Sequence, residues 1–600
     1  MIWFLIGWNP DLLIGNHDQI QGNYPYFKLL ELHQFKKINY TNTIHGGAYI
    51  SPIVGSSILN TILYKMGLSV GNILNLGVII CQTLVGFFSF SLIKDFTDFE
   101  DDPLADAVRI IVITLFISFN PILSWRIEHG HLNLLWAVSF FFAFGNMLGN
   151  VKVNKYVSYV EMFLTWVTGI NALSQHGLQL IFYMLPFFIY YFFKFSTDKK
   201  NHSKLGLLLV LIMSIAIFIS TDLWSFLKFT LSGLGSREVE TNALYSYITY
   251  TLKDLDTFFI LNSTLLNSER SPFLNHEMHY PLIIPFLVFI FYWDSLEYNL
   301  KRSAVLYSII SLLILFLCFN PPVLGWLLER IPVISSFRII GRANILCGLV
   351  LYVLTTTTLL TKKIDKVDLI VILMLIPISI LMKEVSWILE IILWAFFVLT
   401  MSFKKHLKNK FVKIINQSFL YIILLSTFSS TLGIVKPIIN FREIDSVISA
   451  TRNYINSIQI NPNELFLYQG PLKKVIGLNT TMALGVGGIE GYWFATKTVN
   501  EIYSKSLNSE VQGMRMLYPI ISLDQAKFIA NYYPLSQAIS CSQTNCSSLN
   551  LNDSQHSKSQ TDPINFIPTF MAELTTKLLS IILLTFLVIA FANYRRRING

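Results

Sequence analysis

The side chains that could do chemistry in this chain gather in a few short polar stretches of an otherwise apolar sequence. The first stretch is "HDQIQ" at 17–21, and its one carboxylate is Asp18. An Asp here could act as a general base or hold a cation, because one positioned oxygen suffices to take a proton from an attacking hydroxyl. The alternative is an Asp that caps a helix or a turn. The residue type by itself supports both interpretations.

The second stretch is "WRIEHGHLN" at 125–133, which combines a guanidinium, a carboxylate and two imidazoles. Glu128, His129 and His131 near an Asp could hold Mn²⁺ or another divalent ion, because such ions accept carboxylate and imidazole ligands. The alternative is that these side chains hydrogen-bond to neighbouring loops or lipid headgroups. We favour His131 and Arg126 over His129 as functional residues.

Two further stretches precede apolar runs: "SQHG" at 174–177, with His176, and "SSFRIIGRAN" at 335–344, with Arg338 and Arg342. Two guanidinium groups at a helix N-terminus suit a phosphate or pyrophosphate, through bidentate hydrogen bonds and the positive end of the helix dipole. The alternative for this pair is anchoring to lipid headgroups. The cluster "NHEMHY" at 275–280 could bind a metal, but we expect a solvated loop there.

The elements that must position these residues are predicted to be membrane helices. Hydrophobic residues make up 53% of the 600 and charged residues only 14%, against about 25% charged in soluble proteins. Runs of about 20 apolar residues recur and predict a mainly α, polytopic bundle of about 13 to 14 transmembrane helices. The predicted spans are 1–8 (the end of a first helix), 70–94, 106–121, 132–150, 155–172, 177–195, 205–222, 280–293, 303–320, 343–361, 367–382, 386–403, 417–435 and 570–593.

The distribution of Lys and Arg orients this bundle. Alternating the spans with residue 9 outside places the basic stretches at 194–204, 361–366, 404–413 and 595–597 inside. The four polar stretches described above then share the outer face, and the C-terminus is cytoplasmic. The net charge of +9 therefore reflects orientation, and we expect no nucleic-acid partner.

The sequence predicts three parts. Residues 1–435 form the transmembrane domain with outer loops 9–69 and 223–279, residues 436–569 form a small mixed α/β outer domain, and residues 570–600 form the last helix and a basic tail. Cys541 and Cys546 in "CSQTNC" could form a disulfide, because this side would be oxidising; two free thiols are the alternative.

The order of these motifs resembles that in the GT-C class of membrane glycosyltransferases, and more closely that in the bacterial YfhO-like membrane proteins. The resemblance rests on "DQIQGNYPYF" (18–27), "HGGAYISP" (45–52), "EHGHLNLLW" (128–136), "FRIIGR" (337–342) and "GIEGYWFAT" (488–496). It extends in order across most of the chain.

The resemblance implies a GT-C-like fold and an active site at the outer face, fed from the membrane. A sugar would pass from a polyprenyl-phosphate donor to a glycan, lipid or protein acceptor. Asp18 would be the catalytic base or a metal ligand, His131 would orient the substrate, and the Arg pair would hold the lipid phosphate. The residues that we predict to bind substrate are Gln19, Arg126, Glu128, His176, Arg338 and Arg342.

Cofactor use and function class each keep an alternative. Gln19 stands where two-acid versions of this loop carry a second carboxylate, so a metal-independent inverting reaction fits better than one with Mn²⁺ or Mg²⁺ on Asp18, Glu128 and His129.

A transporter or flippase of lipid-linked glycan, or a non-catalytic envelope assembly protein, is the alternative to the enzyme. We find no convincing internal repeat, which argues against a carrier. The expected location is a bacterial inner membrane, with the site on the periplasmic face.

Overall fold

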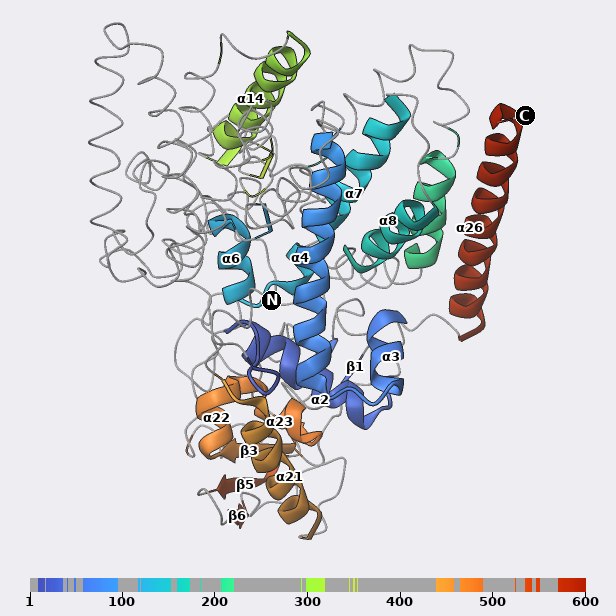
Figure 1. Ribbon diagram of the computed structural model, residues 1–600. Helices are drawn as coiled ribbons and strands as arrows, with labels where there is room; N and C mark the ends of the chain where they lie inside the picture. The colour runs from blue at the N-terminus through green and yellow to red at the C-terminus, as the bar shows by residue number, and fades with distance from the viewer. Residues whose placement is uncertain are drawn as a thin grey trace, which may run out of the picture.

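The architecture is taken from a computed structural model of the chain. The structure describes residues 9–16, 18–35, 40–41, 48–49, 58–94, 117–118, 120–152, 159–172, 184, 206, 208–220, 293, 298–318, 345, 349–350, 353, 439–457, 465–488, 524, 535–541, 546–550 and 570–599. These residues are mainly helical, and a small sheet lies at one end of the molecule (Figure 1).

Three helices form the centre of the described bundle: α4 (Val70–Lys94), α7 (Leu132–Lys152) and α8 (Tyr159–Ala172). Helix α7 packs along both α4 and α8. It approaches α4 closely, since Ser139 Oγ donates to the Cys81 carbonyl at 3.1 Å and Gly77 lies against Leu132. Helices satisfy their own peptide groups, which is the condition for crossing a lipid core.

Six predicted spans coincide with described helices. They are 70–94, 132–150, 155–172, 205–222, 303–320 and 570–593, which correspond to α4, α7, α8, the helix over 208–220, α14 (Tyr298–Cys318) and α26 (Phe570–Asn599). Among the described residues one helix, Val70–Ser91, is long and apolar enough to cross a membrane by length and composition. The other predicted spans lie wholly or almost wholly outside the described residues.

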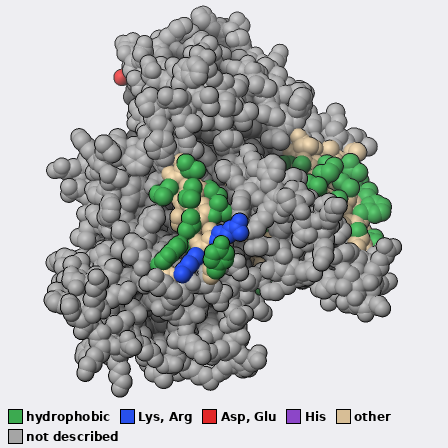
Figure 2. Space-filling model, turned by 90° about the horizontal axis from the view of Figure 1, so that it is seen from above, with side chains coloured by type: hydrophobic (Ala, Val, Ile, Leu, Met, Phe, Trp, Pro, Cys, Tyr) green, Lys and Arg blue, Asp and Glu red, His purple; other side chains and the backbone are tan. Residues whose placement is uncertain are grey.

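Helices α14 and α26 present apolar side chains to the surface. On α14 the exposed residues Val305, Ile309, Leu312 and Leu313 follow one another at helical spacing on one face. Seen from above, the molecule shows apolar side chains beside Lys or Arg side chains (Figure 2). Helix α26 exposes Leu578, Ile582, Phe586 and Ile589 in the same way. Large exposed apolar surfaces of this kind fit contact with a membrane or a partner.

The first polar segment is more ordered than the loop predicted over 9–69. A π-helical turn, η1 (Gln19–Asn23), continues directly into α2 (Tyr24–Leu32). The short antiparallel pair β1 (Tyr40–Thr41) and β2 (Ala48–Tyr49) follows, and α3 (Ile58–Lys65) leads to α4. We call residues 11–32 the Asp18 segment.

The segment 122–131, which the predicted spans 106–121 and 132–150 leave as a short connection, is helical over most of its length. Residues Pro121–Glu128 form helix α6. Asn120 begins it, because its Oδ1 accepts from the Leu123 N–H at 3.0 Å, and Pro121 has a backbone angle suited to the first helical position. Only the turn at His129–His131 stays non-helical before α7. We call residues 126–131 the site turn.

A mixed unit of helices and strands follows the bundle. It contains α21 (Phe441–Ser457), α22 (Pro471–Ile476), α23 (Thr480–Leu484) and a sheet in the order β4-β3-β5-β6. Strand β3 (Leu465–Gln469) is parallel to β4 (Gly487–Gly488) and β5 (Leu535–Cys541), and β6 (Cys546–Asn550) is antiparallel to β5. We call these elements the sheet unit; the boundaries 436–569 stay a prediction.

The β5–β6 hairpin contains both cysteines of the predicted Cys541–Cys546 disulfide. Cys546 is disulfide-bonded, and the strand register places Cys541 directly opposite it. Directly opposed residues of an antiparallel pair lie at a separation that a disulfide can bridge. The predicted Cys541–Cys546 bond agrees with this register.

Candidate functional site

Asp18 lies where the Asp18 segment meets the site turn. Its backbone N–H donates to the His129 carbonyl at 3.1 Å, and the Asn16 N–H donates to the Glu128 carbonyl at 2.6 Å. Two segments more than a hundred residues apart are therefore joined through their peptide groups. Such bonds fix the position of the Asp18 Cα, because burial makes an unpaired peptide group costly.

Two glycines allow the segments to approach this closely. Gly130 has φ of +70°, and a Cβ there would collide with the backbone nitrogen and Cα of Gln19. Gly15 has φ of +99°, and its Cβ would lie 2.6 Å from the Ile127 carbonyl oxygen. Glycine adopts both conformations without steric cost. The Gly in "EHGHLN" is thus required by the contact with the Asp18 segment.

The Asp18 carboxylate is joined to a buried His–Arg pair. His131 Nε2 lies 3.1 Å from Asp18 Oδ2, and Arg126 Nη1 lies 3.2 Å from His131 Nδ1. An Arg can only donate, so Nδ1 accepts and the proton of a neutral ring sits on Nε2, facing Asp18. The guanidinium thereby fixes the tautomer, and His131 orients the carboxylate. Asp18 remains partly accessible, with 31% of its side chain exposed.

Glu128 is a second carboxyl beside this group. Asn16 Nδ2 donates to its Oε1, and its Oε2 is buried with no hydrogen-bond partner within the described part of the chain. Burial raises the pKa of Glu128 to about 7, and the hydrogen bond from Asn16 offsets part of that rise. Its ionisation therefore changes in the neutral pH range, unlike that of an ordinary Glu.

Gln19 is packed under the site turn. Its side chain is fully buried, and its Oε1 accepts from Asn23 Nδ2 at 2.7 Å. Asn23 Nδ2 also donates to the Gly130 carbonyl at 2.9 Å. The structure thus gives Gln19 a packing role between η1 and the site turn, while substrate binding by Gln19 stays a prediction.

The structure brings together five of the predicted site residues: Asp18, Gln19, Arg126, Glu128 and His131. His129 is buried beside His131, with 5.9 Å between the ring centroids. The residues His176, Arg338 and Arg342 lie outside the described residues, as does His17. Their predicted roles are neither supported nor contradicted by this geometry.

Two of the candidate metal ligands from the sequence face other protein groups in the structure. Within the described part of the chain no group of three or more His, Cys, Asp or Glu side chains could hold a metal ion. Asp18 Oδ2 is turned to His131, and Glu128 Oε1 accepts from Asn16. Binding of Mn²⁺ or Mg²⁺ by Asp18, Glu128 and His129 stays a prediction.

Three asparagines that hold the Asp18 segment were missed at the sequence level. Asn16 and Asn23 bond to the site turn, as described above. Asn75 on α4 accepts from the Ile14 N–H at 2.7 Å and donates to the Leu12 carbonyl at 2.9 Å. An Asn in an apolar run is a signal of a buried hydrogen bond, and Asn75 falls inside the predicted span 70–94.

Comparison with known proteins adds little to this site. No protein-family model matches the chain, and no curated protein matches it. Among solved structures, one similar chain is in "Crystal Structure of ArnT from Cupriavidus metallidurans bound to Undecaprenyl phosphate". The identity is 12%, 81% of this chain and 83% of that chain are covered, and the TM-score is 0.41. A likeness at that TM-score carries no argument about activity.

Proposed function

We propose that this protein is a membrane glycosyltransferase that moves a sugar from a polyprenyl-phosphate donor to an acceptor at the outer face. The observation that carries the proposal is the Asp18–His131–Arg126 group: a partly accessible carboxylate, oriented by a buried imidazole whose tautomer a buried guanidinium fixes. A carboxylate held in this way is suited to general base catalysis. The motif order set out in the sequence supports the same class.

The proposed reaction is an inverting displacement in which Asp18 takes the proton. The acceptor hydroxyl attacks C1 of the sugar, and its proton moves to Asp18. The C1–O bond to the phosphate breaks, and the polyprenyl phosphate leaves with the electron pair. We assign the stabilisation of that phosphate to Arg338 and Arg342, which lie outside the described residues. His131 keeps one Asp18 oxygen in place, which limits the orientations the carboxylate can adopt.

The membrane orientation belongs to the proposal as well. Helices α4 and α26 both run away from the end of the molecule that carries the sheet (Figure 1). Helix α4 ends at Lys94, and α26 carries "RRR" at 595–597 near its end. Basic ends of this kind belong on the cytoplasmic side, so the site and the sheet unit would face the periplasm in a bacterial inner membrane.

The buried polar residues of α4 do not favour the transporter alternative. Gln82 exchanges hydrogen bonds with Ser118, whose hydroxyl donates to the Gln82 carbonyl at 2.9 Å. Asn75 bonds to the Asp18 segment. Both side chains are uncharged and bonded to peptide groups, whereas ion-coupled carriers place ionisable groups at such depths.

A transfer assay with purified protein tests the proposal. Wild type in detergent or nanodiscs is given a set of polyprenyl-phosphate sugars, and release of the lipid phosphate is followed. Asp18→Asn should lower the rate by about 100-fold or more, because a general base contributes about that factor.

The matched control is Asp11→Asn, since Asp11 is an acid of the same segment that pairs with Arg442 near the surface. It should keep most of the activity. Undiminished transfer by Asp18→Asn would remove Asp18 as the base. No transfer by the wild type from any donor, together with movement of the lipid across vesicles, would favour a flippase.

A further inference from the structure

The Asp18 segment is held by the sheet unit as well as by the bundle. At its start, the Leu13 N–H donates to the Ile439 carbonyl at 2.8 Å and the Phe441 N–H donates to the Asp11 carbonyl at 3.0 Å. Further along, Asn479 Nδ2 donates to the Gln21 carbonyl at 2.5 Å. Asp18 therefore lies between two attachments to the sheet unit, one on each side of it in sequence.

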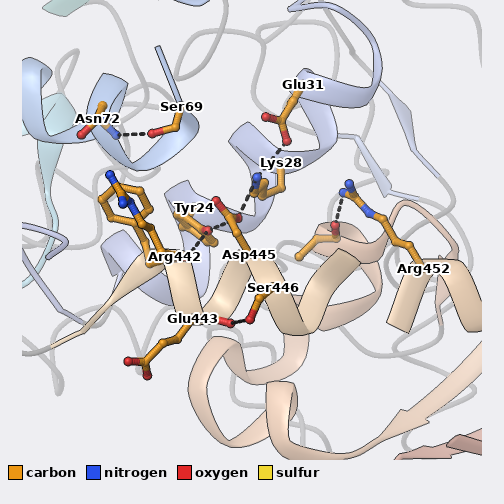
Figure 3. A network of polar contacts seen from close by, with 12 residues as sticks. Tyr24, Lys28, Glu31, Ser69, Asn72, Arg442, Glu443, Asp445, Ser446 and Arg452 are labelled. Carbon is orange, nitrogen blue, oxygen red and sulfur yellow. Dashed lines mark hydrogen bonds and ion pairs between the residues drawn. The ribbon is translucent and has the colours of Figure 1, made fainter. Parts of the chain in front are cut away.

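The strongest part of this attachment is a buried charge network on α2 and α21 (Figure 3). Lys28 Nζ lies 2.7 Å from Asp445 Oδ1 and 2.9 Å from Glu31 Oε2. The Lys28 side chain is 8% exposed and that of Asp445 26%. Tyr24, which is fully buried, donates from its hydroxyl to the same Asp445 oxygen at 2.5 Å.

Arg452 ties this network to α23. Its Nε and Nη2 donate to the carbonyls of Leu484 and Ala483, at 3.2 and 2.5 Å. Burial lowers the pKa of Arg452, while the negative charges of Glu31 and Asp445 raise it. Two carboxylates and two cations thus balance one another where α2 meets the sheet unit.

Helix α2 continues from η1 without a break, so a shift at Lys28 is transmitted to Asp18. Residues 19–32 form one helical run, and Lys28 lies ten positions after Asp18, at most about 15 Å away along the axis at the α-helical rise of 1.5 Å per residue. A packed helix moves as a rigid body, because its peptide groups are paired along its length. The position of Asp18 therefore depends on the contact between Lys28 and Asp445.

We propose that Lys28 and Asp445 are a positioning pair through which the sheet unit sets the place of Asp18. Neither residue touches the reacting atoms; they act through α2 and η1. The inference rests on the proposed function for its catalytic consequence. Removing one partner of a buried ion pair leaves an uncompensated buried charge, which is far more disruptive than removing an exposed pair.

The test compares Lys28→Met with two matched variants. Met keeps the apolar stem and removes the charge. Lys28→Arg keeps the charge, and Arg442→Met removes the other ion pair between the same two segments, Arg442–Asp11 at 2.7 Å, whose Arg side chain is 68% exposed. Asp445→Asn is the second variant if Lys28→Met does not fold, as judged by size-exclusion chromatography in detergent.

Two readouts are measured on the full chain. The first is hydrogen–deuterium exchange of the 16–24 amides; it should rise in Lys28→Met and stay near wild type in Arg442→Met and Lys28→Arg. The second is transfer kinetics, in which Lys28→Met should lower kcat by about tenfold to a hundredfold, since a misplacement of about 1 Å costs that much, with the donor KM within about threefold. A loss of packing alone would not lower kcat while the donor KM stays nearly constant, and Lys28→Arg would then not restore kcat.

The outcomes separate this inference from the proposed function. Unchanged exchange at 16–24 in Lys28→Met overturns the positioning pair, whatever the enzyme does. A raised exchange with unchanged kcat also overturns it, because Asp18 would then not depend on α2. If the wild type transfers no sugar, the exchange experiment still decides whether the sheet unit holds the segment, and only the proposed function fails.

Discussion

The Asp18 segment touches two parts of the molecule, and the two contacts differ in kind. Against the site turn it uses peptide hydrogen bonds, two glycines and a neutral imidazole. Against the sheet unit it also uses peptide hydrogen bonds, at Leu13 and Phe441, and adds ion pairs centred on Lys28 and Asp445. Peptide hydrogen bonds fix the backbone at both contacts, and only the sheet-unit contact adds ion pairs along α2, which fix the direction of that helix. The difference indicates that the site turn sets the local geometry of Asp18 and that the sheet unit sets where the segment lies.

The largest loss of stability is expected when a side chain is added to Gly130, where the site turn contacts Gln19. Gly130→Ala places a Cβ against the Gln19 backbone, and a positive φ adds about 1–2 kcal/mol for an L-residue. We expect a loss of stability above about 3 kcal/mol, measured as a large fall in melting temperature or a failure to express.

Two other glycines serve as controls for this variant. Gly67 has φ of +86° and nothing within 4 Å, so Gly67→Ala should show only the conformational cost. Gly485 meets the flexible end of Leu32 in the sheet-unit contact, so Gly485→Ala should be intermediate. Equal effects at Gly130 and Gly67 would show that close backbone approach is not what holds the site turn.

An intermediate and pH-dependent effect is expected for Glu128→Gln. The pKa of Glu128 is raised from 4.5 to about 7, so the wild type loses stability as pH rises from 4.5 through 7 and the buried carboxyl ionises. Gln keeps the acceptor for Asn16 and does not ionise. At pH 8 the free energy of unfolding of the variant should therefore exceed that of the wild type by on the order of 2–3 kcal/mol. The stability of the variant should not fall between pH 4.5 and 7 as that of the wild type does.

Melting curves in detergent between pH 4.5 and 8 check this prediction. The difference between the variant and the wild type should grow across that interval and level off above pH 7. A difference that is the same at every pH would mean that Glu128 is ionised throughout, and the site turn would then hold a buried carboxylate in addition to the buried Arg126 guanidinium.

The smallest effect is expected for Tyr24→Phe in the sheet-unit contact. It removes one hydrogen bond to the Asp445 carboxylate while Lys28 keeps its place, so the cost should be about 1.5 kcal/mol. Burial, followed by the charge of Asp445, raises the pKa of the Tyr24 hydroxyl far above its usual range, so it stays protonated. The loss in melting temperature should be equal at pH 5 and pH 8. A loss as large as that of Lys28→Met would make the hydroxyl, rather than the ion pair, the main contact.

The site was predictable from the sequence in part. Apolar periodicity located α4, α7 and α26, because membrane-type helices need long apolar runs whatever surrounds them. The stretch "WRIEHGHLN" pointed to His131 and Arg126, and the structure joins His131 to Asp18 and Arg126 to His131. Helix α6 was predicted as part of a loop, since a helix of two turns carries too little periodicity to be recognised.

The sequence by itself determined the residue types of the site and the positions of its main apolar helices, because both are local properties of the chain. Only the tertiary structure decided which groups meet. The Gly130 contact with Gln19, the Asn75 bonds to the Asp18 segment and the Lys28–Asp445 pair each join residues far apart in the chain. Such contacts depend on how buried polar groups find partners in three dimensions, and no spacing in a single sequence specifies those partners.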